Sequence, residues 1–302
     1  MSLTAAMIGT TTEPIVHDVD SRWLMAYAAG FASLDPCYLD TRRDGGIEAH
    51  PLFPVCLEWP TVLALGDRLK AAGLTRDESA RSVHYTHDLV IHRAVRPGDR
   101  TRTTATLASI EPHRSGTLAI LRLETVDDRG EPIASTAMGS LYRDATPRPG
   151  ADAGAGADGG TEASPEPAPD PVHAQRVTVA AGAAHVYTEC SRIWNPIHTD
   201  PRTAARAGLP GIILHGTATL AMAVSEVVRH DADGQPGRVR RIEARFVGMV
   251  PMPSEIEIRI FPATERTGDG TTDGGARSVP FDVQGPTGRR VLREGTVRLG
   301  DS

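Results

Sequence analysis

The sequence contains few of the residues that mark several common classes of protein. It has only three cysteines in 302 residues, Cys37, Cys56 and Cys190, and no CxxC motif or Cys/His pair with zinc-ligand spacing. A disulfide scaffold is therefore excluded, and the pattern predicts no metal site. Reduced thiols in a cytoplasmic protein are the expectation.

Long apolar runs and basic clusters are absent as well. No run approaches the roughly 20 apolar residues that a membrane span needs. The first residues lack the basic region and apolar stretch of a signal peptide. The net charge is −6, and no Lys/Arg cluster is interleaved with aromatic residues. We therefore expect a protein that neither crosses a membrane nor binds nucleic acid.

The overall composition is that of a globular protein, with 40% hydrophobic and 23% charged residues. The length suits two domains of about 150 residues each. Between them, residues 150–170 read GADAGAGADGGTEASPEPAPD, with no aromatic residue and only acidic charges. Such a segment cannot bury enough apolar surface to offset its ordering entropy, and this indicates a flexible linker. The predicted division is a first domain over 1–144, a linker over 145–172 and a second domain over 173–302.

Both predicted domains have the same order of elements, helices first and about four strands afterwards. In the first, the patterns predict helices at 21–30 and 58–72 and strands at 82–94, 101–110, 117–127 and 132–142. In the second, they predict a leading strand at 175–180, a helix at 216–229 and strands at 238–250, 255–262, 277–283 and 289–299. This repeat favours an α+β fold in which two helix-wrapped antiparallel sheets pair edge to edge as a pseudo-dimer.

Two short motifs in the second half combine residues that can carry chemistry. Asn195-Pro196-Ile197-His198 contains the only asparagine of the chain and a turn signal that would hold an amide near an imidazole. Sixteen residues separate His198 from His215-Gly216, which precedes an apolar helix. The first N–H groups of a helix have no partner within it, and glycine lets a ligand approach the backbone closely. The Gly216 N–H could therefore stabilise an oxyanion such as a thioester enolate.

These motifs and their spacing resemble the MaoC-like family of (R)-specific enoyl-CoA hydratases and 3-hydroxyacyl-thioester dehydratases. The first half resembles the degenerate N-terminal hot-dog of two-domain members, at Tyr27–Gly30, Asp35–Tyr38, His50–Phe53 and Arg96–Asp99. The resemblance implies a double hot-dog fold, a thioester of CoA or of an acyl carrier protein as substrate, and no cofactor. Assembly into a homodimer is left open.

The resemblance also implies roles for individual residues. His198 would be the general base, Asn195 would orient the water or the β-oxygen, and the Gly216 N–H would polarise the thioester carbonyl. The substrate site would be lined by Ile193, Trp194 and His215.

The sequence departs from the family pattern at Ile193. An acid that shares the catalytic water with the histidine is expected at this position. His198 then acts alone, or Glu189 or Asp200 replaces the acid, or the hydration activity is weak or lost.

Several readings therefore stay open at this point. The first is a hydratase/dehydratase. The second, suggested by Ile193, is a thioester-binding scaffold without catalysis, and the third is a thioesterase on the same fold. The first half has no Asn-Pro-x-His motif. Structural roles or lining of an acyl tunnel are therefore expected there for Asp35, Tyr38, His50 and His84.

Overall fold

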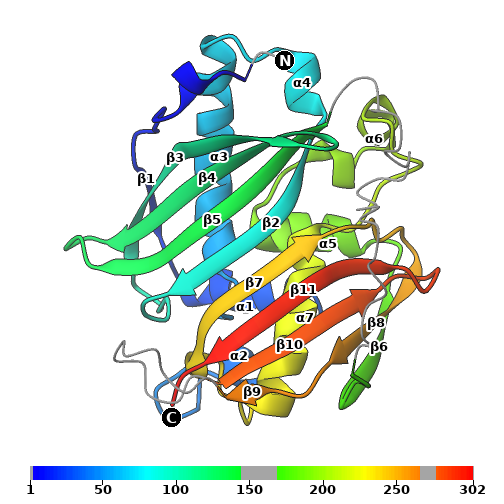
Figure 1. Ribbon diagram of the computed structural model, residues 1–302. Helices are drawn as coiled ribbons and strands as arrows, with labels where there is room; N and C mark the ends of the chain where they lie inside the picture. Colours follow the sequence, from blue (N-terminus) through cyan, green and yellow to red (C-terminus); the bar gives the residue numbers. More distant parts are fainter. Residues whose placement is uncertain (1–2, 144–168, 266–276, 302) are drawn as a thin grey trace.

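The computed structural model describes residues 3–143, 169–265 and 277–301 (Figure 1). The first half contains η1 Ala5–Met7, β1 Ile15–Asp18, α1 Ser21–Gly30, α2 Pro36–Leu39, α3 Pro54–Ala71, α4 Arg76–Ala80, β2 Ser82–Ile91, β3 Arg100–His113, β4 Gly116–Asp127 and β5 Pro132–Arg143. The second contains β6 His173–Val179, α5 Ala183–Ser191, η2 Pro196–His198, α6 Pro201–Arg206, α7 Gly216–Asp231, η3 Pro236–Arg238, β7 Val239–Phe246, β8 Ser254–Ile260, β9 Thr264–Glu265, β10 Arg277–Gln284 and β11 Arg290–Leu299.

All strands of this described part join one 11-stranded antiparallel sheet. Its order is β1-β3-β4-β5-β2-β7-β11-β10-β8-β6, with β9 beside β10. The halves meet where β2 pairs with β7, with Asp88 opposite Glu243. Outward from this seam, the strands of the first half follow the order β2-β5-β4-β3-β1, and those of the second half follow the order β7-β11-β10-β8-β6. The two orders are equivalent when the strands of each half are counted along the chain without the short β9. A pseudo-two-fold axis therefore relates the halves. The predicted α+β fold with edge-to-edge pairing is confirmed.

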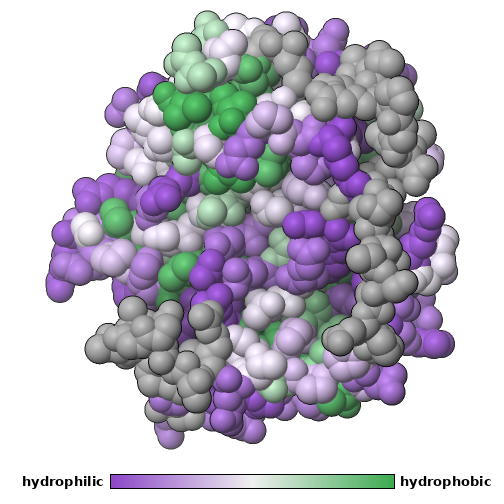
Figure 2. Space-filling view, viewed as in Figure 1, coloured by the Kyte–Doolittle hydropathy of each residue, from purple (hydrophilic) through white to green (hydrophobic). Residues whose placement is uncertain are grey.

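The two faces of the sheet differ in polarity. Figure 2 shows hydrophilic side chains over the middle of the face that Figure 1 presents. Across the seam on that sheet, the Arg241 guanidinium donates to both Asp88 carboxylate oxygens at 2.6 Å and also lies 3.2 Å from a Glu243 oxygen. The long helices α3 and α7 lie on the other face (Figure 1). The core therefore lies between these helices and the sheet.

The main core contains side chains of both halves. On α7, Leu220, Val224 and Val227 are buried against strand residues such as Ile242 and Phe281. Burial of such a side chain contributes roughly 1.5–3 kcal/mol, so this apolar helix is fixed mainly by packing. None of the helices in the described ranges is long and apolar enough to span a membrane.

The shorter helices α1 and α5 pack on each other near the seam. A Cβ atom built on Gly30 would lie 2.7 Å from the Cβ atom of Cys190, so only glycine permits this close approach. The contact holds the end of α5, and with it the loop that follows, against the first half.

Some predicted element boundaries were wrong. The helix predicted to begin at residue 58 begins at Pro54. Proline fits the first turn of a helix because the N–H that it lacks would have no partner there. Residues 183–191, where no helix was predicted, form α5, which ends at Arg192 in the left-handed region with φ 62°. β7 ends at Phe246 rather than residue 250. The predicted linker lies mostly outside the described residues, so the domain boundaries stay predictions.

Candidate active site

The loop between α5 and α6 orients the imidazole of His198. The 3-10 turn Pro196–His198 buries the ring, which is 9% exposed, and brings its Nδ1 to 2.8 Å from the Ile213 carbonyl oxygen. A carbonyl oxygen can only accept, so Nδ1 carries the proton. In the neutral ring this leaves Nε2 as the basic nitrogen.

A second imidazole supports the first. The rings of His198 and His215 stack with centroids 3.7 Å apart, and the Nε2 atom of His215 lies 3.2 Å from the Thr188 hydroxyl. Burial lowers the pKa of His198 to about 4. Burial and the neighbouring His198 lower the pKa of His215 to about 2. Both rings are therefore neutral near pH 7, and His198 is in the form that can accept a proton.

Gly216, the first residue of α7, directly follows His215. A Cβ atom added to Gly216 would lie 2.8 Å from Cδ1 of Phe246 at the end of β7. On the second residue of α7, the Thr217 hydroxyl accepts a hydrogen bond from the Tyr187 hydroxyl at 3.1 Å. The start of α7 is thus a rigid group of N–H donors beside an aromatic ring, one residue from the stacked histidines.

The other residues proposed for the site lie around this pair in different environments. Asn195 is half-buried, and its Oδ1 accepts from the Ile197 N–H at 3.4 Å, which leaves its Nδ2 for a ligand. Ile193 is 6% exposed and belongs to the core. Trp194 is 55% exposed, so its side chain lies largely on the surface. Ile193 is thus a core residue and Asn195 a half-buried one, while the Trp194 side chain is largely in solvent.

Neither carboxylate considered as a replacement acid is bonded to His198 within the described residues. Asp200 caps α6 and accepts from the Arg202 and Thr203 N–H groups and from the Thr203 hydroxyl. Glu189 lies on the exposed side of α5. The catalytic group that the geometry offers is therefore a single imidazole.

The pseudo-two-fold axis relates this site to a second place, in the first half. There Asp35-Pro36-Cys37-Tyr38 follows α1 as Asn195-Pro196-Ile197-His198 follows α5, and Pro54 begins α3 as Gly216 begins α7. Tyrosine in place of the histidine is no base at neutral pH. Proline has no N–H to donate.

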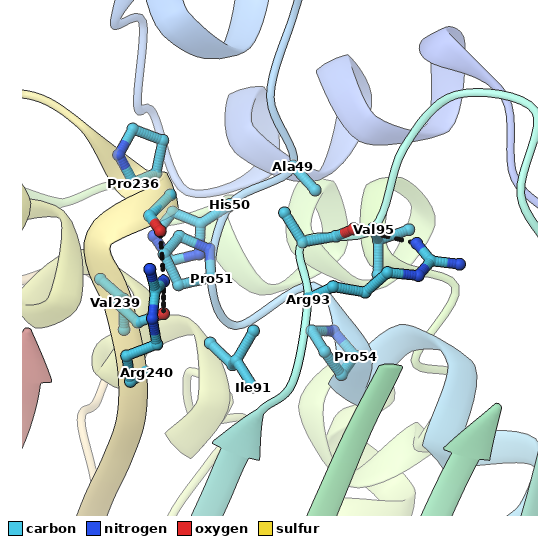
Figure 3. Close-up of a pocket in the computed structure, with 12 residues that line it drawn as sticks. Ala49, His50, Pro51, Pro54, Ile91, Arg93, Val95, Pro236, Val239 and Arg240 are labelled. Atoms are coloured by element: carbon cyan, nitrogen blue, oxygen red, sulfur yellow. Dashed lines mark hydrogen bonds between the residues drawn. The ribbon is translucent and has the colours of Figure 1, made fainter. Parts of the chain in front are cut away.

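A small cavity lies at this related place (Figure 3). It is lined among others by Pro51, Pro54, Ile91 and Val239, and its volume of about 20 Å³ suffices for a water molecule but not for an acyl chain. The first-half site has therefore lost both its base and its donor.

Sequence reasoning did not single out Phe246 or Thr188 as parts of the site. Thr188 comes next to His215 because residues 183–191 form a helix, and Phe246 reaches Gly216 through strand pairing that joins distant segments. No local sequence signal marks either residue.

The fold is thus a double hot-dog in which two stacked histidines lie at the start of a central helix. Two family models match the chain: the MaoC like domain over residues 162–279 and the FAS1-like dehydratase domain region over residues 6–136. Residues 162–279 therefore carry a MaoC-like dehydratase domain, and residues 6–136 resemble a FAS1-like dehydratase domain region.

Curated relatives share short stretches with the chain. A fatty acid synthase subunit beta of Aspergillus oryzae is 44% identical over 77 residues, which are 25% of this chain and 4% of the relative. The peroxisomal enoyl-CoA hydratase 2 of Arabidopsis thaliana is 40% identical over 57 residues, or 19% of this chain and 18% of the relative. The chain thus spans a small part of these proteins.

Solved structures share the whole fold. A MaoC-like dehydratase from Phytophthora capsici matches with a TM-score of 0.78 and 21% identity over 99% of both chains. A protein of Mycobacterium tuberculosis described as having a double hotdog fold matches with a TM-score of 0.59 and 17% identity, over 97% of this chain and 96% of that one. The predicted double hot-dog architecture is therefore confirmed.

The close approach of Gly216 to Phe246 leads to a first prediction. In Gly216→Ala the new methyl group must displace the Phe246 ring or the first turn of α7, and the N–H donor moves with it. We expect kcat/KM for an enoyl thioester to fall by about 10- to 100-fold, as small misplacements of catalytic groups do. Steady-state kinetics measure this change. The matched control is Gly211→Ala, whose Cβ would meet nothing within 4 Å; equal losses in both variants would contradict a role for Gly216.

Proposed function

We propose that the protein catalyses the reversible hydration of 2-enoyl thioesters to (3R)-3-hydroxyacyl thioesters of CoA or of an acyl carrier protein. The observation that supports this most directly is the hydrogen bond from His198 Nδ1 to the Ile213 carbonyl. It leaves a neutral imidazole with a basic Nε2 near the N–H donors that begin α7. The match of residues 162–279 to the MaoC like domain supports the same class, a hydro-lyase.

In the hydration direction the thioester oxygen accepts a hydrogen bond from the Gly216 N–H, which draws electron density from Cβ. His198 Nε2 removes a proton from water while the water oxygen bonds to Cβ. The resulting imidazolium then gives that proton to Cα, and the enolate returns to a thioester. One imidazole can thus carry the proton through the whole addition, so the isoleucine at 193 is compatible with turnover. The free Nδ2 of Asn195 would orient the attacking water.

A second candidate is a thioester-binding protein without catalysis. The burial of Ile193 in the core and the absence of a carboxylate bonded to His198 in the described part of the chain favour it. Such a protein would keep the thioester contacts at α7 but would not exchange water with the substrate.

The test is a panel of trans-2-enoyl-CoA substrates of increasing chain length, analysed by mass spectrometry. Gain of one water at a rate above the enzyme-free control supports the proposal. Release of free CoA thiol, detected with a thiol reagent, would instead indicate a thioesterase. Binding of the thioesters with no change of mass across the panel would favour the non-catalytic candidate.

A further inference from the structure

Two histidines of the first half lie on β2, the strand at the seam, and of these His87 is buried and His84 half-buried. His84 and His87 are three positions apart, yet their rings meet with centroids 5.4 Å apart. A bulge explains the contact: His84 pairs with Ser140 and Thr86 with Gly139, so Tyr85 is an extra residue in the strand. The bulge turns both imidazoles to the same side of the sheet. His87 is 2% exposed, and its neighbour on that side, Leu89, belongs to the main core.

These imidazoles connect with the candidate active site through one aromatic ring. The ring of His84 lies 4.5 Å from that of Phe246, centroid to centroid. The same Phe246 ring is the group that a Cβ atom on Gly216 would touch. A chain that extends from a thioester at Gly216 along β7 therefore meets Phe246 first and the two imidazoles next.

Three of the four ring nitrogens of this pair have no partner among the described residues. They are Nε2 of His84 and both ring nitrogens of His87, and all three atoms are buried. Buried polar atoms in proteins are nearly always hydrogen-bonded, because an unpaired one is destabilising. Three such atoms in one cluster are therefore unusual and call for a function that offsets the instability.

The related place in the first half has no such group. The pseudo-two-fold axis relates Asp88 on β2 to Glu243 on β7. The residues one and four positions earlier are His87 and His84 on β2, and they correspond to Ile242 and Val239 on β7. Val239 lines the small cavity drawn in Figure 3. The strand that borders the degenerate site is thus apolar where the strand that borders the Gly216 site has imidazoles.

From this placement we propose that His84 and His87 form a polar end of the acyl site and bind a hydroxyl or keto oxygen carried by the acyl chain. The substrate class would then be oxygenated enoyl thioesters rather than plain alkyl ones. This inference rests on the proposed function, because it takes the thioester to be bound at Gly216.

The protonation of the pair fits a neutral ligand group. Burial lowers the pKa of His84 to about 3 and that of His87 to about 4, so both rings are neutral near pH 7. A neutral imidazole offers one donor and one acceptor, and a hydroxyl group can use both. A carboxylate would have to be desolvated without a cationic partner, which disfavours it.

The test compares binding of octanoyl-CoA with binding of derivatives that carry one hydroxyl at C4 to C8, none of which is a substrate or product of the proposed reaction. Isothermal titration calorimetry on the full chain measures each Kd. We expect one hydroxylated position to bind at least about tenfold more tightly than octanoyl-CoA, the gain of a good hydrogen bond in a buried site. In His87→Leu the ratio should fall to about one, whereas His92→Leu, at the exposed end of the same segment, should keep it.

The outcomes separate the two proposals. If all the thioesters bind equally well, this inference fails and the proposed function stands. If none of them binds, both fail. Thermal unfolding gives an independent readout, since leucine in place of an unpaired buried imidazole should raise the Tm of His87→Leu. A lower Tm together with an unchanged binding ratio would mean that His87 only supports the fold, and it would overturn the inference.

Discussion

Replacing His198 by alanine is expected to lower kcat/KM for enoyl-CoA hydration by about 10²- to 10⁴-fold, the range typical of a lost general base. The expected loss is large because neither Glu189 nor Asp200 is bonded to His198 within the described residues, so neither carboxylate is placed to act in its stead. The change is measured as the rate of hydration of a short trans-2-enoyl-CoA, monitored by the loss of absorbance of its conjugated enoyl thioester.

A second variant separates the base from the structural role of the ring. In His198→Asn, the side-chain amide can still donate to the Ile213 carbonyl as Nδ1 does, but it has no basic nitrogen. We expect it to restore any stability lost in His198→Ala without restoring activity. Asn195 offers a further comparison, because its loss should remove water orientation but leave the base. If His198→Asn kept wild-type activity, the base would lie elsewhere.

The position of His198 could be predicted from the sequence because the motif is local. Four consecutive residues form the turn, and a proline starts it, so the histidine is placed by short-range geometry. The start of α7 was also predictable, since the apolar run that follows His215-Gly216 has helical length. These two features contain the proposed base, His198, and the proposed oxyanion donor, the Gly216 N–H, on which the proposed function depends.

The surroundings of the site could not be predicted because they depend on long-range pairing. Phe246 contacts Gly216 only after β7 has paired with β2 and β11. The bulge at Tyr85, which brings the rings of His84 and His87 together, contains no glycine or proline from which it could be predicted. Trp194, expected near the acyl chain, is 55% exposed. Its proposed role in substrate binding stays a prediction.

Acidification is the second change from which we expect a large effect, here on stability. Burial is the first cause that lowers the pKa of each of five histidines, to about 3 for His50, 3 for His84, 4 for His87, 4 for His198 and 2 for His215. In the unfolded chain each ring titrates near its ordinary value of 6.5. Between about pH 6.5 and pH 4 the unfolded state therefore binds more protons, and stability falls as the pH falls.

One buried carboxyl acts in the opposite direction. Burial raises the pKa of Glu58 to about 7 from its ordinary 4.5, although the Thr136 hydroxyl donates to it at 2.5 Å. As the pH falls, Glu58 therefore binds its proton in the folded state before it does so in the unfolded state. This difference stabilises the folded state increasingly as the pH falls from 7 to 4.5. It offsets one of the five imidazoles, which leaves a net uptake of about four protons on unfolding near pH 5.

Each proton of this difference changes the free energy of unfolding by about 1.4 kcal/mol per pH unit, so the net slope near pH 5 is about 5 kcal/mol per unit. A domain with a stability of about 5–15 kcal/mol should then unfold cooperatively a few pH units below neutrality, with a midpoint near pH 5. Circular dichroism against pH measures the midpoint, and urea unfolding at several pH values gives the slope.

In the double variant His84→Leu/His87→Leu two of the protons are removed, so the midpoint should move to lower pH and the slope should fall by about half. An unchanged slope in that variant would mean that these two rings are not neutral in the folded state, which would also remove the basis for assigning them a neutral ligand.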